Sequence, residues 1–152
     1  MTYLALSRFR TSGPFLAVLL LTACGDSFEV IEETNFAEVL NIDLTTMTRT
    51  SSGLYIEQLA EGTGPAAVAG QRVTVSYTGW LSNGSSFDDG QFTFTLGVGE
   101  VVAGFDEGVL GMRVDGARRI IIPPELGYGA AGQGPIPGGS VLIFRIQVVG
   151  IT

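Results

Sequence analysis

Arg72-Val-Thr-Val-Ser-Tyr-Thr78 and Gln91-Phe-Thr-Phe-Thr-Leu96 stand on either side of Ser82-Asn83-Gly84-Ser85. Both outer stretches alternate polar and apolar residues, which is the period of a strand with one buried face. Asn-Gly is the dipeptide most typical of a tight hairpin turn. The sequence therefore predicts two antiparallel strands joined by this turn, with Phe92 and Phe94 on one face of the second strand.

Three further strands are predicted around this hairpin, at Leu54–Leu59, Gly116–Ile122 and Ser140–Val149. The last of them is nearly all apolar, as expected of a strand covered on both faces. The long Gly/Pro-rich connection Pro123–Gly139 separates the last two strands, and loops of this length in a small domain are usually functional.

One short helix is predicted, because Val101, Val102, Phe105, Val109 and Leu110 recur at helical spacing. Several glycines lie within this segment and weaken it as an isolated helix, so packing against a sheet must hold it. The fold class expected is α+β: a twisted antiparallel β-sheet wrapped around one short α-helix.

Nine aromatic side chains are spread through residues 53–152, a stretch that contains no histidine, lysine or cysteine. They are Tyr55, Tyr77, Trp80, Phe87, Phe92, Phe94, Phe105, Tyr128 and Phe144. The missing residue types exclude an imidazole base, an amine nucleophile, a thiolate and the usual nitrogen and sulfur ligands of a metal site. We therefore expect no metal and no other cofactor, and a function that depends on shape, apolar surface and a few hydrogen bonds.

Residues 1–23 have the three parts of a secretory signal peptide: the basic start with Arg8 and Arg10, the apolar run Phe15–Leu21, and small residues at the cut. Cys24 is the only cysteine, and Leu21-Thr-Ala-Cys24 resembles the lipobox of bacterial lipoproteins, in which this cysteine carries the lipid. An ordinary signal peptide with a chance cysteine is the alternative. Acyl chains on Cys24 would anchor the protein to a membrane.

Residues 24–52 are predicted to be the acylated Cys24 and a polar tether, with a short helix over Phe36–Leu40 capped by Thr34 or Asn35. Lipid attachment implies the cell envelope, on the periplasmic side, and Gly25 favours the outer membrane in a Gram-negative host. The formal net charge of −7 argues against a nucleic-acid partner and against docking on anionic lipid.

From residue 53 onward the sequence resembles the FKBP-type peptidyl-prolyl cis-trans isomerases. The resemblance runs in one collinear order through Val75–Leu81, Phe87-Asp88, Phe92–Gly97, Glu100–Val109, Ile122–Gly129, Ile136-Pro137 and Leu142–Phe144. It implies an isomerase domain over 53–152 and proline-containing segments of exported proteins as substrates. It also raises macrolide-type inhibitors as a class of ligand.

Carried over position by position, the resemblance implies a proline pocket. The implied catalytic residues are Asp88, Tyr128, Val102 (through its backbone N–H) and Phe105 as the floor. The implied substrate-binding residues are Tyr77, Phe87, Phe92, Val101, Ile136 and Phe144. Between the two alternating phenylalanines, Phe92 matches the wall of the pocket and Phe94 the deeper position.

The chain departs from the family pattern in three places. Phe105 stands where the best-known members have tryptophan, and the segment after Asp88 is shorter than the usual loop. That segment lacks the arginine that normally pairs with the aspartate. The long loop is also shortened around Gln133–Pro135.

Rotation about an Xaa-Pro bond needs no nucleophile, which agrees with the residue types present. Its barrier of ~18–20 kcal/mol comes from amide resonance, which is lost in the twisted transition state. An apolar pocket that excludes water disfavours the polar planar amide relative to the twisted one.

Two other functions remain open at this stage. A catalytically weak FKBP-fold chaperone or proline-segment binding module would use the same pocket. A structural lipoprotein would have aromatics only as core, which is the usual role of aromatics at alternating strand positions such as Phe92 and Phe144. We expect the pair Arg118-Arg119 to face solvent or nearby acids and assign it no function.

Overall fold

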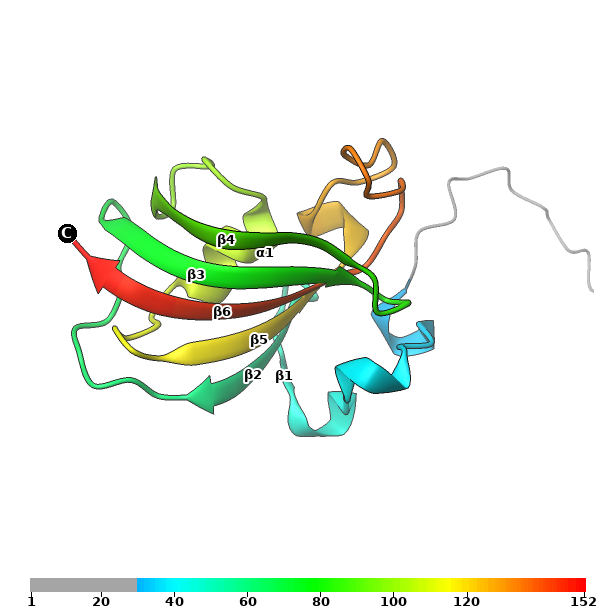
Figure 1. The fold of residues 1–152 in the computed structure, drawn as a ribbon, viewed down its shortest axis with the longest axis horizontal. Coiled ribbons are helices and arrows are strands. Elements are labelled where there is room, and N and C mark those ends of the chain that lie inside the picture. Colours follow the sequence, from blue (N-terminus) through cyan, green and yellow to red (C-terminus); the bar gives the residue numbers. More distant parts are fainter. Residues whose placement is uncertain (1–29) are drawn as a thin grey trace, which may run out of the picture.

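The computed structural model describes residues 30–152, which form one antiparallel sheet with a short helix against it (Figure 1). The strand order across the sheet is β1-β2-β5-β6-β3-β4. The strands are β1 (Thr48–Arg49), β2 (Tyr55–Ala60), β3 (Arg72–Leu81), β4 (Ser86–Thr95), β5 (Ala117–Ile122) and β6 (Leu142–Ile151). The helical elements of this part of the chain are α1 (Ala103–Val109) and the single 3-10 turns η1 (Ile31–Glu33), η2 (Glu38–Leu40), η3 (Leu44–Thr46) and η4 (Pro124–Leu126). The predicted α+β class and the short helix against a twisted sheet are confirmed.

The β3–β4 hairpin forms at the predicted turn. The Gly84 N–H donates to the Leu81 carbonyl over 2.9 Å, and the Ser85 N–H donates to the Asn83 side chain over 2.9 Å. Gly84 has a φ of +86°, a conformation that favours glycine. The strand β4 begins five residues earlier than predicted, because Ser86 to Gly90 also pair with β3.

Glycines allow α1 to lie close to β5. A Cβ atom on Gly104 would stand 2.5 Å from Cγ2 of Ile122, and one on Gly108 would stand 2.7 Å from Cδ1 of Ile120. The glycines that weaken α1 as an isolated helix therefore permit the contact that holds it in place. The resulting cluster fills the face of the sheet that we call the inner face.

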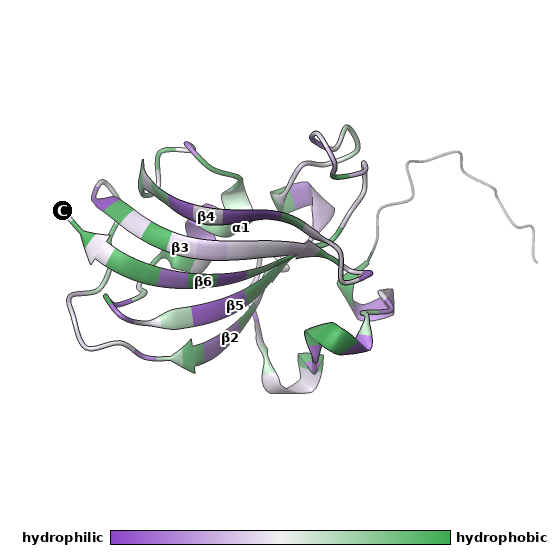
Figure 2. Cartoon of the chain, viewed as in Figure 1, coloured by the Kyte–Doolittle hydropathy of each residue, from purple (hydrophilic) through white to green (hydrophobic). Residues whose placement is uncertain are grey.

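A second hydrophobic cluster covers the opposite face, which we call the outer face. Successive side chains of a strand point to opposite faces, so Ile120 belongs to the inner cluster and Ile121 to the outer one. Figure 2 shows the apolar and polar residues along β6, which contributes Ile143 to the outer cluster and Phe144 to the inner one.

Residues 24–52 were predicted to be a polar tether, but the described part of this segment is packed against the sheet. Residues 30–49 form η1, η2, η3 and β1 and pack on the outer face, where Ile31 is only 3% exposed. The expected helix over Phe36–Leu40 is a single 3-10 turn that begins after Ala37. The physical reason is that the outer face of β2, β5 and β6 is apolar at Tyr55, Ile121 and Ile143 and must be covered.

Polar contacts hold this N-terminal layer to the sheet. The Tyr55 hydroxyl donates to Glu32 over 2.8 Å, and Arg49 forms an ion pair with the same carboxylate at 3.0 Å. The guanidinium of Arg119 donates to the Leu40 carbonyl over 2.6 Å and pairs with Glu57. The expected acid partner of Arg119 is thus found.

Arg118, by contrast, does not face open solvent. Its guanidinium donates to the carbonyls of Gly108 and Leu110 at the end of α1, over 3.0 and 2.9 Å. Burial lowers the pKa of Arg118 from its ordinary value. The side chain therefore supplies donors for helix carbonyls that have no partner within the helix.

The predicted signal peptide and Cys24 lie outside the described residues. Within residues 30–152, no helix is both long enough and apolar enough to cross a membrane.

Candidate functional site

A cavity of about 150 Å³ opens on the inner face between β4, the start of α1 and the loop after β5. We call it the aromatic cavity. It is lined by Phe87, Asp88, Phe92, Glu100, Val101, Val102, Phe105, Tyr128 and Phe144. The structure thus brings together eight of the ten residues that the sequence nominated, from segments far apart in the chain, and adds Glu100.

Phe105 forms the floor of the aromatic cavity. It is only 3% exposed and meets Phe144 edge to face, with ring centroids 5.2 Å apart and an interplanar angle of 86°. Its ring also lies 5.9 Å from that of Phe92. Rings that contact one another in this way hold each other in place, so the floor is preformed.

The two phenylalanines of β4 occupy different depths, as predicted. Phe94 is 2% exposed and lies in the core, whereas Phe92 lines the cavity and stacks on Phe94 at 5.3 Å. Tyr77 lies behind the cavity rather than in its lining. Its ring packs edge to face on Phe92 at 5.2 Å and on Phe105 at 6.2 Å.

A β-bulge in β4 turns two consecutive side chains toward the cavity. Gly79 of β3 pairs with Asp88, and the next residue, Trp80, pairs with Ser86. Phe87 is therefore the extra residue of the bulge. Phe87 then packs edge to face on Phe144 at 5.4 Å. Gly79 makes room for this pair, because a Cβ there would stand 2.6 Å from the ring of Phe87.

Tyr77 orients the carboxylate of Asp88 at the rim. The Tyr77 hydroxyl donates to Oδ2 of Asp88 over 2.6 Å. Burial, followed by this hydrogen bond to a carboxylate, raises the pKa of Tyr77 to about 12. The family's arginine partner is missing from the sequence after Asp88, and in the described part of the chain the tyrosine hydroxyl restrains the carboxylate instead.

Val102 presents a backbone donor to the cavity. Its carbonyl accepts from the N–H groups of Phe105 and Asp106 over 3.0 and 3.1 Å and so begins α1. Across residues 30–152, no acceptor is recorded for the Val102 N–H itself. A bound carbonyl oxygen can therefore take this donor.

The carboxylate of Asp106 fixes the loop that leads into Val101 and Val102. It accepts from the Gly97 N–H over 2.8 Å and from the Gly99 N–H over 3.4 Å. Glu100 closes the same loop by accepting from the Thr95 N–H over 3.1 Å, and this bond lowers the pKa of the Glu100 carboxyl. The sequence placed Glu100 inside the matching segment, but a lone exposed acid gave no sign that it lines the cavity.

Tyr128 and Ile136 come from the long loop and take different positions. Tyr128 lines the cavity, and no hydrogen-bond partner within residues 30–152 is recorded for its hydroxyl. Ile136 is buried in the inner cluster and is not part of the cavity lining. The loop is closed by short backbone bonds, including one from the Gly139 N–H to the Gly129 carbonyl at 2.8 Å.

The cavity is lined by two carboxylates, Asp88 and Glu100, and by no histidine, lysine or cysteine of the described part of the chain. Within residues 30–152, no group of three histidine, cysteine, aspartate or glutamate side chains is placed to hold a metal ion. The polar groups that face the cavity are the two carboxylates of Asp88 and Glu100, the Tyr128 hydroxyl and the Val102 N–H. Such a site can bind an apolar ring and form hydrogen bonds to the polar groups beside it.

Comparison with known proteins agrees with this chemistry. Residues 64–149 match the family model of the FKBP-type peptidyl-prolyl cis-trans isomerases. The FK506-binding protein of Neisseria meningitidis serogroup B is 50% identical over 103 residues, which cover 64% of this chain and 94% of the relative. The FK506-binding protein of serogroup C is 47% identical over 102 residues, covering 63% of this chain and 94% of the relative.

Two solved structures share the fold. The crystal structure of AtFKBP13 has a TM-score of 0.66 and 38% identity, over 70% of this chain and 98% of the other. The crystal structure of FkpA from Escherichia coli has a TM-score of 0.67 and 30% identity, over 76% of this chain and 55% of the other. The family match covers β3, β4, α1, β5, most of β6 and the whole aromatic cavity, and the chain therefore belongs to the FKBP-type peptidyl-prolyl cis-trans isomerases.

Proposed function

We propose that this isomerase acts on proline-containing segments of exported proteins, that its reaction takes place in the aromatic cavity, and that a lipid on Cys24 holds it at the cell envelope. The single observation that supports the choice of cavity is its Phe105 floor, enclosed by aromatic rings and bordered by the unpaired Val102 N–H.

The mechanism follows from what the cavity contains. The proline ring rests on Phe105, between Phe92 and Phe144, in a place where the walls are apolar. The planar amide is polar and loses solvation there, whereas the twisted amide has less charge separation and loses less. Every ~1.4 kcal/mol of this difference gives a factor of ten in rate.

The polar groups position the chain on either side of proline. The Val102 N–H and the Tyr128 hydroxyl donate to backbone carbonyls, so the substrate cannot turn as a whole when its Xaa-Pro bond turns. Asp88 stays at the rim because Tyr77 holds its carboxylate at 2.6 Å. No covalent bond forms or breaks, and no proton is transferred.

The test is exchange spectroscopy of an Xaa-Pro tetrapeptide by NMR, with the full-length chain in a mild non-ionic detergent. We expect Asp88→Ala to lower kcat/KM about tenfold, a loss of ~1.4 kcal/mol of transition-state stabilisation. Asp89→Ala is the matched control, because Asp89 is exposed and lies one residue further along the same strand. Equal catalysis by both variants and the unaltered chain would remove Asp88 from the mechanism.

The alternative function gives a different result in the same experiment. A binding module without catalysis would leave the exchange rate at its value in buffer, while the peptide resonances still shifted on addition of the protein. Loss of both the shift and the catalysis in a folded Phe105→Leu variant would assign both to the aromatic cavity.

Macrolide-type inhibitors provide a second probe of the cavity. The relatives of serogroups B and C are named FK506-binding proteins. We expect FK506 to compete with the tetrapeptide, and to lose affinity in the Phe105→Leu variant. FK506 that bound without displacing the tetrapeptide would place the two ligands at different sites.

The anchoring proposal is supported by the sequence at residues 1–24, which has the parts of a lipoprotein leader. We expect the full-length chain to incorporate labelled palmitate and to fractionate with membranes. Cys24→Ala should abolish both, because no other cysteine can carry the lipid. A Cys24→Ala protein that stayed in the membrane fraction would contradict the lipid anchor.

A further inference from the structure

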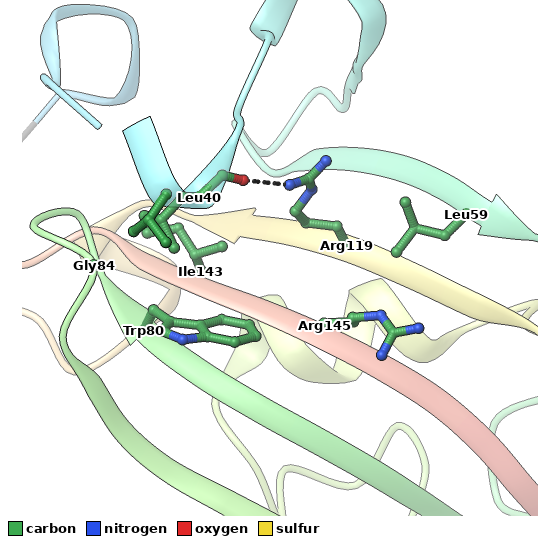
Figure 3. A pocket seen from close by; sticks show the side chains of 8 residues that line it. Leu40, Leu59, Trp80, Gly84, Arg119, Ile143 and Arg145 are labelled. Atoms are coloured by element: carbon green, nitrogen blue, oxygen red, sulfur yellow. Dashed lines mark hydrogen bonds between the residues drawn. The ribbon is translucent and has the colours of Figure 1, made fainter. Parts of the chain in front are cut away.

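A larger concavity lies on the outer face, on the other side of the sheet from the aromatic cavity. It measures about 340 Å³ and lies between the N-terminal layer and strands β2, β5, β6 and β3 (Figure 3). We call it the outer groove. Figure 3 shows the indole of Trp80 along one side of it, with Leu40 and Arg119 across from it.

The outer groove exposes apolar side chains that the fold does not use. Val39 on its rim is 81% exposed and Leu59 is 41% exposed, while the half-buried Trp80 forms an apolar floor above the buried Ile143. Isolated exposed aliphatic side chains are common on protein surfaces. Here they surround one concavity, which is the arrangement of a binding groove.

The charges beside this apolar floor are unbalanced. Glu57, Arg119 and Arg145 stand directly opposite one another on the neighbouring strands β2, β5 and β6. Two like charges in a direct cross-strand pair destabilise a sheet. Glu57 pairs with Arg119, and within residues 30–152 no carboxylate is recorded within ion-pair distance of Arg145.

Within residues 30–152, Arg72, Arg113 and Arg118 also have no recorded ion pair, but of these four arginines Arg145 is the one that lines the outer groove. The formal net charge is −7, and all of the basic residues are arginines. A carboxylate placed over Arg145 would complete the row Glu57–Arg119–Arg145 and relieve the like-charge pair.

The groove is built in advance of any ligand. Arg119 holds the Leu40 carbonyl at 2.6 Å, and the Ala37 N–H donates to the Ser82 carbonyl over 2.8 Å. These bonds fix η2 as one wall. Val39 and Leu40 also precede residues 64–149, so this wall is not part of the segment that matches the family model.

We infer that the outer groove binds an extended segment of another polypeptide in which an apolar side chain stands next to a carboxylate. The apolar side chain lies on Trp80, and the carboxylate pairs with Arg145. The volume is near the lower end of the ~300–1,000 Å³ of ligand pockets, which suits one or two side chains rather than a folded partner. The inference does not depend on the isomerase reaction, because the aromatic cavity lies on the other face.

Trp80 makes the test direct, since it is the only tryptophan of the chain. The probe is the capped peptide acetyl-Gly-Phe-Glu-Gly-amide, which has no proline, titrated into the full-length chain in a mild non-ionic detergent. We expect a saturable change in tryptophan fluorescence. The peptide with Gln in place of Glu should bind about fivefold more weakly, the upper range for a partly exposed ion pair.

Two variants assign the effect to the groove. Arg145→Gln should make the Glu and Gln peptides bind equally while leaving the isomerase rate unchanged. Arg72→Gln, at an exposed arginine outside the outer groove, should keep the fivefold difference. Equal binding of the two peptides to the unaltered chain, or a difference that survives Arg145→Gln, would overturn the inference. So would a fluorescence change that depends on protein concentration alone, which would indicate a second copy of this chain as the occupant.

Discussion

The inner face of the sheet is covered by α1 and a set of mutually contacting aromatic rings, whereas the outer face is covered by the single turns of residues 30–49. The inner cover leaves the aromatic cavity, whose aromatic walls pack against one another. The outer cover depends on a few buried side chains and on polar contacts such as Arg119 to Leu40. We therefore expect the inner face to control both stability and catalysis, and the outer face to affect stability but not catalysis.

The largest expected effect comes from removing the floor of the aromatic cavity. Phe105→Ala should lower the free energy of unfolding by about 3–5 kcal/mol, the usual cost of deleting a buried aromatic ring. It should also abolish measurable isomerase activity, because the proline ring loses the surface on which it rests. Denaturant unfolding and peptide exchange measure the two effects, and Phe105→Leu separates them by restoring most of the volume.

The matching change on the outer face is Ile31→Ala. Ile31 is 3% exposed and anchors η1, so we expect a loss of about 2 kcal/mol in the free energy of unfolding, the lower end for such truncations. The isomerase activity per folded molecule should not change. A large fall in kcat/KM for this variant would show that the two faces are coupled, and it would contradict the expectation that the outer face does not affect catalysis.

A smaller effect is expected from Asp106→Asn on the inner side. The asparagine keeps one oxygen, so one of the bonds to the Gly97 and Gly99 N–H groups is weakened or lost, at about 1 kcal/mol. The loop that leads to Val101 and Val102 should loosen, which raises KM more than it lowers kcat. Steady-state kinetics with an Xaa-Pro peptide test this. Glu107→Gln, on the same helix with its carboxylate on Ser52, is the control that should leave KM unchanged.

The smallest effects compare two tyrosine–carboxylate pairs, one on each face. Tyr77→Phe removes a donor from Asp88, and Tyr55→Phe removes one from Glu32. Each should cost about 1 kcal/mol of stability or less. Only Tyr77→Phe should reduce kcat/KM, because only this pair borders the aromatic cavity. Equal kinetics for the two variants would show that orientation of Asp88 does not matter.

The pH dependence of the inner pair has a definite sign. The pKa of Tyr77 is raised to about 12 from its ordinary value of 10. A raised pKa means that the folded state favours the protonated phenol, so this contribution is complete below pH 10 and is lost as the pH rises through 12. Asp88→Asn should lower the pKa only part of the way, since burial is the larger cause. Carbon-13 NMR of the tyrosine rings follows this titration.

Much of the fold and of the aromatic cavity could be predicted, because local sequence patterns indicate the elements that form the inner face. Alternation predicted β3 and the second half of β4, Asn83-Gly84 predicted the turn, and the spacing of apolar residues predicted α1. Eight of the ten nominated residues line the aromatic cavity. They could be nominated because they lie in segments that match the family in order and spacing. The first half of β4 was not predicted, since Asp88-Asp89-Gly90 has the composition of a turn and is extended only by pairing with β3.

The outer layer could not be predicted in the same way. The apolar side chains of residues 30–49 are scattered among polar ones with no sustained period, so the sequence predicted a polar tether. Their order comes from long-range contacts, such as the one between Tyr55 and Glu32, that no local pattern records. The positions of Tyr77 and Ile136 behind the cavity lining likewise depend on how far each side chain reaches, which only the packed structure decides.

The packed N-terminal layer shortens the distance over which a lipid on Cys24 would let the isomerase domain move from a membrane. A flexible tether from Cys24 to residue 52 would extend as far as about 95 Å, at ~3.3–3.6 Å per residue. With residues 30–49 fixed to the sheet, only the chain length between Cys24 and Val30 separates the proposed lipid from the packed layer, and this length spans at most about 20 Å. The proposed lipid on Cys24 would therefore keep the isomerase close to the bilayer, where it would meet chains as they emerge at the membrane rather than those already in the bulk.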